Sequence, residues 1–264
     1  MNPSFGRLIL LTGAEAAAAL AESRVIVVGI GGVGSWCAEA LVRSGIGKIS
    51  LVDSDSVCVS NINRQAQALH STIGRLKTAA LEDRLKDINP DCEVTAFPRV
   101  FSKESADTFG IAEADYVIDA IDSLGCKLDL IETALALGRP FFSSMGMAQK
   151  LDPTLIRTSD IWETSGCPLA RLVRQGLRKR NCSGHFTAVY SPELLPLQES
   201  SAGDGSAVSG GVPDDSRPGG NWDSGKKVIN GSAVTVTAAA GMVLASLVIR
   251  DVCARFKPIG FLGG

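Results

Sequence analysis

The feature that most constrains this chain is a glycine-rich turn that joins a short apolar strand to a helix. Residues 24–29 read RVIVVG and residues 29–34 read GIGGVG, just before a predicted helix over 35–44. Glycines let the backbone turn tightly and approach a polyphosphate, and the N–H groups at the start of the helix then face the anion. This arrangement predicts a nucleotide site, but by itself it fits NAD, FAD or ATP.

The order of strands and helices predicts the fold class. Short β-branched runs alternate with segments that carry apolar residues at helical spacing. We therefore predict an α/β fold with a Rossmann-like, doubly wound, mainly parallel sheet and a C-terminal extension. The predicted strands cover 24–29, 48–53, 92–98, 114–122 and 139–145, and the predicted helices cover 35–44, 75–88, 103–110 and 127–138.

The regular alternation fades after about residue 150. A basic helix is expected over 168–180 and a strand near 186–193. Residues 199–225 are rich in Ser, Gly, Pro and Asp, a composition that buries too little apolar surface to become ordered, so we expect a mobile loop there. An apolar helix is expected over 232–255. It is long enough to span a bilayer, but its many Ser, Thr and Ala residues favour a helix buried in the core or in a dimer over a membrane anchor.

The overall composition excludes several kinds of site. The chain has 264 residues, of which 45% are hydrophobic, and a formal net charge of -2. These values are typical of a globular protein. No cysteine lies within four residues of another and the chain has only 2 histidines, so neither a CxxC zinc pair nor a histidine-rich metal site is expected. No secretory signal is evident, so we expect reduced thiols and a cytoplasmic protein.

Polar residues gather after the second and the later predicted strands. Asp53 ends the second strand, where a carboxylate can accept hydrogen bonds from ribose hydroxyls. Arg64 and Lys77 could supply cations to the β- and γ-phosphates. Asp119 and Asp122 lie at the end of a later strand, and Asp122 is the better Mg²⁺ candidate because it lies beyond the strand proper. A hydride-transfer enzyme needs no such cluster, so these residues favour ATP over NAD.

Several separate motifs occur together in one order: GIGGVGSW, DSDSVCVSNINRQ, Lys77 and DAIDS. Over roughly residues 1–195 the chain thereby resembles the ThiF/MoeB/HesA superfamily, the ubiquitin-activating-type adenylyltransferases. The resemblance implies a homodimer in which a substrate carboxylate attacks the α-phosphate of ATP and releases pyrophosphate. Together with the composition of the later segments, it divides the chain into an ATP-binding adenylation domain (1–195), a flexible Gly/Ser-rich loop (196–231) and a C-terminal apolar helix that packs on the core or in the dimer (232–264).

The resemblance also implies roles for individual residues. Asp122 would bind Mg²⁺, and Arg7 would reach across the dimer to the partner's ATP. The implied catalytic residues are Arg64, Lys77, Asp122 and Arg7, and the implied nucleotide-binding residues are Gly29, Gly31, Gly32, Gly34, Asp53, Asp55, Asn61, Asn63 and Gln65.

Each of these assignments has a structural alternative. Arg64 and Lys77 could be solvated surface charges, because most Arg and Lys side chains are exposed. Asp119 could cap a strand end and Asp55 could be a turn residue. Arg7 lies near a terminus, where the chain is often poorly ordered.

Within the superfamily, the segment DPTLIRTSDIWETSGCPLARLVR most resembles the branch of tRNA threonylcarbamoyladenosine dehydratases. That branch implies adenylation of the threonyl carboxylate on adenosine 37 of tRNA, after which the neighbouring carbamoyl group displaces AMP and closes a ring. The alternative is an adenylyltransferase that activates the C-terminus of a ubiquitin-like sulfur-carrier protein, although such branches usually carry two CxxC pairs. A sulfur-transfer or cysteine desulfurase partner is left open. The Asn61–Gln65 cluster argues against an NAD-dependent dehydrogenase, and the full set of candidate catalytic residues argues against an inactive nucleotide-binding scaffold.

Two further features bear on the substrate. Arg171, Arg174 and Arg178 are spaced to share one face of the predicted basic helix, which suits contact with tRNA phosphates, although a solvated helix face fits equally well. Cys167 and Cys182 are the candidate nucleophilic cysteines. Cys182 lies among cationic residues, which favour a thiolate, but an inert structural role is the better interpretation of both.

Overall fold

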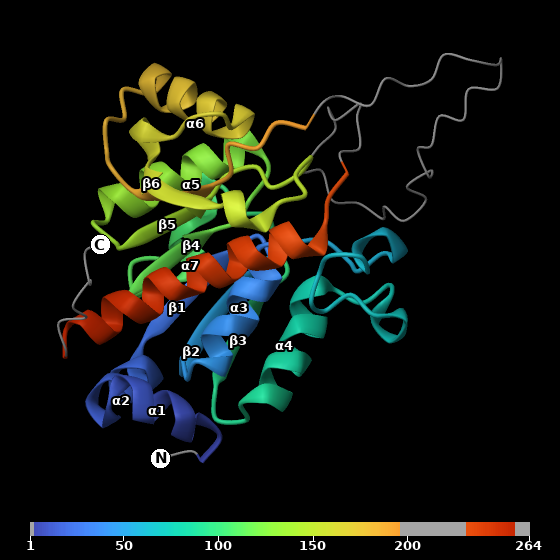
Figure 1. The fold of residues 1–264 in the computed structure, drawn as a ribbon, viewed down its shortest axis with the longest axis vertical. Helices are drawn as coiled ribbons and strands as arrows, with labels where there is room; N and C mark the ends of the chain where they lie inside the picture. Colours follow the sequence, from blue (N-terminus) through green and yellow to red (C-terminus); the bar gives the residue numbers. More distant parts are fainter. Residues whose placement is uncertain (1–2, 196–230, 257–264) are drawn as a thin grey trace.

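The computed structural model describes residues 3–195 and 231–256, which build one seven-stranded sheet with helices on both faces (Figure 1). The strand order is β3-β2-β1-β4-β5-β7-β6, and every pair is parallel except β6 with β7. This architecture confirms the predicted doubly wound α/β fold. The strands are β1 (Arg24–Val28), β2 (Lys48–Val52), β3 (Glu93–Phe97), β4 (Tyr116–Asp119), β5 (Phe141–Ser144), β6 (Arg157–Asp160) and β7 (Thr187–Tyr190).

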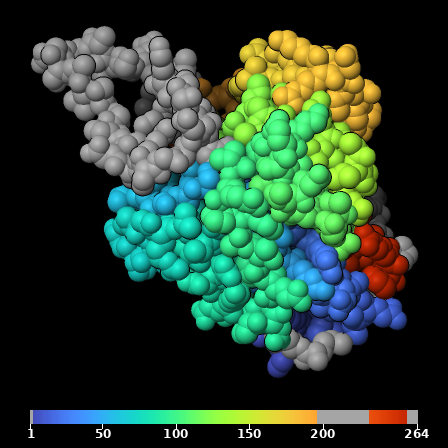
Figure 2. Space-filling model, turned by 180° about the vertical axis from the view of Figure 1, so that it is seen from behind, coloured from blue at the N-terminus to red at the C-terminus, as the bar shows by residue number. Residues whose placement is uncertain are grey.

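The helices divide between the two faces of the sheet because successive strand residues point to opposite sides. Val25 and Val27 of β1 face a core shared with α3, α4 and α7, whereas Ile26 and Val28 face a core shared with η4, α5 and α6. Figure 2 views the molecule from behind, where the green segment with η4 and α5 is in front. The α-helices are α1 (Gly6–Thr12), α2 (Ala14–Glu22), α3 (Gly34–Arg43), α4 (Lys77–Ile88), α5 (Leu124–Ala136), α6 (Pro168–Lys179) and α7 (Val234–Ala254).

Some elements differ from the sequence prediction. The helix expected over 103–110 is a 3₁₀ helix, η4 (Lys103–Phe109). The helices α1 and α2 and the strand β6 were not predicted. β6 reads RTSD, and a polar edge strand shows no alternation of apolar residues from which it could be recognised. The short 3₁₀ helices are η1 (Pro3–Phe5), η2 (Val59–Asn61), η3 (His70–Thr72), η5 (Pro153–Leu155) and η6 (Ile161–Glu163). The loop expected over 199–225 lies outside the described residues.

Helix α7 packs closely on α3. A Cβ atom at Gly241 would lie 2.5 Å from the carbonyl oxygen of Val33, so glycine is needed at this crossing. At its other end, Asp251 accepts a hydrogen bond from the Tyr116 hydroxyl at 2.5 Å, and Arg255 donates to the same hydroxyl at 2.6 Å. These contacts attach α7, the last helix of the described residues, to the central strand β4.

In the part of the chain that the structure describes, α7 is also the one helix that is long and apolar enough to cross a membrane. Half of its most apolar 18-residue window is buried inside the protein.

Candidate functional site

The glycine-rich turn lies where the order of the strands reverses. β1 is followed along the chain by β2 on one side, whereas β4 lies on its other side and is followed by β5. Ligands of open α/β sheets bind in the crevice at the carboxyl ends of strands at such a point. Gly29 has a positive φ of 85°, and a Cβ atom there would lie 2.8 Å from the carbonyl carbon of Ala120 after β4. The turn is therefore pressed against the neighbouring strand end.

The remaining glycines of the turn do two different things. A Cβ atom at Gly34 would lie 1.9 Å from the carbonyl oxygen of Gly29, and one at Gly32 would lie 3.2 Å from the Cβ of Thr237 in α7. These two glycines permit close packing. Among the described residues, the one atom within 4 Å of a Cβ built at Gly31 would be the Gln65 side-chain nitrogen, at 3.9 Å, so the described chain leaves room beside Gly31. In the described part of the chain no side chain caps α3 at its N-terminus, which suits an approaching anion.

Asp53 holds the turn from the end of β2. One carboxylate oxygen accepts the N–H of Ile30 at 3.0 Å, and the other accepts the N–H of Asp55 at 2.9 Å. The Nζ atom of Lys77 lies 3.8 Å from Asp53 Oδ1 and 2.7 Å from Asp55 Oδ2. The structure thus brings Asp53, Asp55 and Lys77 together beside the glycine turn.

Burial sets the protonation behaviour of this group. Burial raises the pKa of the Asp53 carboxyl above its usual range, while Lys77 acts in the opposite direction. For Lys77, burial alone would lower the pKa, but the attraction of Asp53 and Asp55 outweighs it and leaves that pKa raised. Lys77 is therefore a buried, charged ammonium and not the solvated surface charge that was the alternative.

Three hydrogen bonds attach the segment after η2 to the glycine turn and to the first residues of α3. The Gln67 amide donates to the carbonyl oxygen of Ile30 at 2.9 Å, and the Trp36 indole donates to that of Arg64 at 3.0 Å. The Ser35 hydroxyl accepts the N–H of Ala66 at 3.1 Å. Gln67 and Trp36 were not among the predicted site residues. The one sequence feature that could have pointed to Gln67 is its place two positions after Gln65, which was predicted to bind the nucleotide.

Arg64 is held in a fixed orientation. Its guanidinium donates to the Ser60 carbonyl oxygen at 2.7 Å and to Asn63 Oδ1 at 2.9 Å. The amide of Asn63 donates in turn to the carbonyl oxygen of Ser232, just before α7. Asn61 is buried and accepts from the N–H of Cys58 at 3.2 Å. Asn61 and Asn63 therefore hold neighbouring protein groups, and Arg64 presents a preset cation.

Asp119 and Asp122 lie in different surroundings. Asp119 is fully buried, and its carboxylate pairs with the Nζ atom of Lys127 at 2.6 Å. This pairing supports the structural interpretation of Asp119 and adds Lys127, which had been predicted only as part of a helix. Asp122 is exposed, in the short loop between β4 and α5.

The described residues contain no group of three or more His, Cys, Asp and Glu that could hold a metal by themselves. Mg²⁺ often binds through one or two carboxylates together with substrate phosphates. Asp122, at the carboxyl edge of the sheet and exposed, fits that manner of binding.

The N-terminal helices lie at the opposite end of the strands. Phe5 packs near Gly45, and a Cβ atom at Gly47 would lie 1.8 Å from the carbonyl oxygen of Ala21. Both glycines precede β2 and so mark the amino ends of the strands. The structure therefore does not bring the exposed Arg7 of α1 to the glycine turn of its own chain (Figure 1).

The three arginines of α6 are not equivalent. Arg174 is half-buried and donates to the Thr164 hydroxyl and, at 3.4 Å, to the Ile161 carbonyl oxygen. The guanidinium of Arg178 lies 5.2 Å from the centre of the Trp162 ring. Arg171 is exposed. Of the three, Arg171 and Arg178 have the greater freedom to meet an external phosphate.

The candidate cysteines contribute little to this site. Cys167 is buried at the start of α6, and Cys182 is partly buried against the core on the same face of the sheet. Their positions agree with the inert structural role favoured from the sequence.

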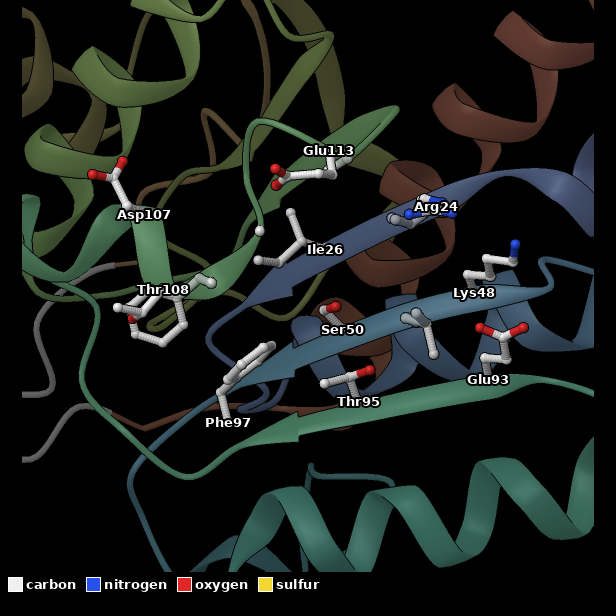
Figure 3. Close-up of a pocket in the computed structure, with 15 residues that line it drawn as sticks. Arg24, Ile26, Lys48, Ser50, Glu93, Thr95, Phe97, Asp107, Thr108 and Glu113 are labelled. Atoms are coloured by element: carbon white, nitrogen blue, oxygen red, sulfur yellow. The ribbon is translucent and has the colours of Figure 1, made fainter.

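A hollow of about 460 Å³ lies elsewhere, on the face of β1, β2 and β3 beside η4 (Figure 3). Its rim carries Glu93, Asp107 and Glu113 together with Arg24 and Lys48. Three carboxylates would repel a polyphosphate, and none of the α-helices in the described residues begins at the hollow. The glycine turn is the better nucleotide site on chemical grounds.

Replacing Lys77 with Met tests the buried group. We expect it to cost about 3 kcal/mol of unfolding free energy at pH 7.5, because Asp53 is left buried without its cation. Without Lys77 the folded-state pKa of Asp53 rises further above its unfolded value. The variant therefore loses stability as the pH rises through the folded-state pKa of Asp53. The loss of unfolding free energy caused by Lys77→Met should accordingly be smaller at pH 5 than at pH 7.5.

Urea denaturation at both pH values measures this difference. Lys86→Met is the matched control, since Lys86 lies on the same helix in an exposed pair with Glu82 and should change stability by less than about 0.5 kcal/mol. An equal cost of Lys77→Met at pH 5 and pH 7.5 would show that Asp53 does not depend on Lys77.

The chain is similar to known proteins along most of its length. The chain is 43% identical to the tRNA threonylcarbamoyladenosine dehydratase of Bacillus subtilis over 193 residues, which cover 73% of this chain and 76% of the relative. It is 35% identical to the Escherichia coli protein of the same name over 258 residues, which cover 95% of this chain and 94% of the relative.

The crystal structure of the E. coli tRNA N6-threonylcarbamoyladenosine dehydratase in complex with ATP superimposes with a TM-score of 0.80 at 32% identity, covering 98% of this chain and 97% of that one. The sequence model of the ThiF family matches residues 5–257 of this chain. Because this match spans nearly the whole chain and the relatives share its full architecture, the chain belongs to the ThiF family.

Proposed function

We propose that this chain is an ATP-dependent tRNA threonylcarbamoyladenosine dehydratase, which cyclises the threonylcarbamoyl group of adenosine 37 through an acyl-adenylate. The observation that carries the proposal is the similarity to a dehydratase of that name over 95% of the chain. The glycine turn, Asp53, Arg64 and Lys77 supply a matching site for ATP, which the E. coli relative binds according to its structure.

The chemistry follows from the surroundings of the turn. A carboxylate is a poor electrophile, and joining it to AMP gives it a good leaving group. In this proposal the turn and the start of α3 bind the phosphates, and Asp53, which also braces the turn, accepts hydrogen bonds from the ribose. Arg64 and Lys77 stabilise the negative charge that develops on the departing pyrophosphate.

Mg²⁺ bound at Asp122 would add charge stabilisation on the phosphate oxygens. The chain's own part is to place Asp122 at the carboxyl edge of the sheet, next to the crevice at Gly29. The second step needs no protein nucleophile, because the carbamoyl group is already tethered beside the adenylate and proximity favours ring closure. The buried Cys167 and the partly buried Cys182 are consistent with a mechanism that does not use them.

The alternative substrate is the C-terminus of a sulfur-carrier protein. The chain contains no CxxC pair, and its similarity extends along nearly the full length of the E. coli dehydratase. Both observations favour the dehydratase. A sulfur-transfer or cysteine desulfurase partner stays outside the present proposal.

We also propose that the enzyme is a cytoplasmic homodimer with residues 1–195 as its adenylating unit. Arg7 lies at the wrong end of its own sheet to reach the glycine turn, so a site that uses Arg7 must take it from a second copy. The burial of half of the apolar window of α7 supports a core role for that helix over a membrane anchor.

Incubation with ATP, Mg²⁺ and threonylcarbamoyl-modified tRNA tests the function. Mass spectrometry of the nucleosides should show the modified adenosine lighter by one water. Asp122→Ala should slow this reaction by about 100-fold or more, since it removes the proposed metal ligand. Asp83→Ala, at an exposed ion pair on α4, is the control and should retain activity. An unchanged nucleoside mass with the wild-type protein would refute the dehydratase.

Mixing two inactive variants tests the shared site. Arg7→Ala and Lys77→Ala subunits should together recover activity, because one of the two sites in each mixed dimer then contains neither substitution. Recovery should approach half of the wild-type rate per mixed dimer, measured as AMP formation after subunit exchange. Confirmed exchange without recovery would assign Arg7 no role in the partner's site.

Double replacement of Arg171 and Arg178 with Ala tests tRNA contact. We expect weaker tRNA binding and a salt slope smaller by about one to two, as each phosphate contact contributes roughly 0.9. The control replaces the exposed Arg43 and Lys86 on α3 and α4 with Ala, which removes equal charge. If both double variants behave alike in a binding titration over several salt concentrations, α6 is not the tRNA interface.

A further inference from the structure

A fully enclosed ion pair lies directly beneath the loop that carries Asp122. Asp119 and Lys127 both have side chains with 0% exposure, and their charged atoms are 2.6 Å apart. The Asp119 carboxylate also accepts the Ser143 hydroxyl at 2.6 Å, and Lys127 Nζ donates to the Ser144 carbonyl oxygen at 2.9 Å. The pair therefore joins β4, β5 and α5.

Stability alone is a weak reason for such a pair. Removing two charges from water costs several kcal/mol per ion, and a well-packed apolar pair of similar volume is often as stable or more so. Apolar contacts are not directional. An ion pair with satisfied hydrogen bonds, in contrast, fixes the position and orientation of each group that it contacts.

The second oxygen of Asp119 shows which geometry is fixed. It accepts the N–H of Ile121 at 3.0 Å, one residue before Asp122. The intervening Ala120 donates its N–H to Val28 at 2.9 Å and borders Gly29. The carboxylate thus holds the loop between the glycine turn and Asp122 from below.

Lys127 fixes the same loop from its far end. The loop begins at Asp119 and runs into α5, which starts at Leu124, and Lys127 lies on the first turns of that helix. Both ends of the short connection are therefore anchored to one buried ion pair.

We propose that Lys127 is a positioning residue for the metal, which acts through Asp119 to set Asp122 beside the phosphates of ATP. This inference rests on the proposed function, because it requires Mg²⁺ and ATP to meet at this edge of the sheet. Groups that orient a metal ligand typically change metal affinity by about 10- to 100-fold when removed.

Calorimetric titration of ATP, once with Mg²⁺ and once with EDTA, measures the effect without any turnover. In the wild-type protein Mg²⁺ should tighten ATP binding. In Lys127→Met this tightening should fall by about 10-fold or more, while binding in EDTA changes by less than about twofold. Lys127→Arg keeps the charge and should restore most of the Mg²⁺ effect.

Two further variants separate positioning from stability. Asp119→Asn combined with Lys127→Met leaves no unpaired buried charge, so it should fold where Lys127→Met alone fails, and it should still lose the Mg²⁺ effect. Val248→Ala removes buried apolar volume from α7, and should lower the melting temperature while keeping the Mg²⁺ effect.

The outcomes are distinct. A folded Lys127→Met or double variant with the wild-type Mg²⁺ effect would overturn the positioning role and leave the proposed function standing. A wild-type protein whose ATP affinity does not respond to Mg²⁺ would overturn the metal-dependent function and this inference with it.

Discussion

The close approach of Gly29 to the end of β4 is the constraint on which the rest of the site depends. A side chain at Gly29 would collide with the backbone of Ala120, and one at Gly34 would collide with Gly29 itself. Because the turn is this tight, α3 begins directly above the switch point of the sheet. The start of a helix, the ends of β1, β2 and β4, and open space beside Gly31 then meet at one place.

Polar side chains around the turn form hydrogen bonds to its backbone and to the neighbouring segment, and so hold the turn in place without a ligand. Asp53 accepts the N–H of Ile30, Gln67 donates to the same residue, and Trp36 fastens the Arg64 segment. The cations Arg64 and Lys77 are held by protein acceptors in advance, so little ordering is left for the moment of binding. Such preorganisation is what stabilising charge on a leaving pyrophosphate requires.

The sequence predicts the fold and the position of the glycine turn because strand alternation and glycine spacing are local signals. It predicts less well where burial decides. The position of Asp122 beyond the strand favoured it over Asp119 as the Mg²⁺ candidate, but nothing in the sequence indicated that the Asp119 carboxylate pairs with the buried Lys127. Asn63 was predicted to contact the nucleotide. In the structure its side chain accepts a hydrogen bond from Arg64 and donates one to the carbonyl oxygen of Ser232. The contact with Ser232 joins residues 169 positions apart, so no local pattern in the sequence could predict it. The edge strand β6 carries no apolar pattern and is visible only from its pairing with β7.

Titration of the protein with ATP and, separately, with NADH tests the central claim most directly, namely that the glycine turn and its cations form an ATP site. The account predicts saturable binding of ATP, one per chain, with NADH binding far weaker or absent, because the role proposed for Arg64 and Lys77 is to bind the phosphates of ATP. Tight binding of NADH without binding of ATP would contradict it.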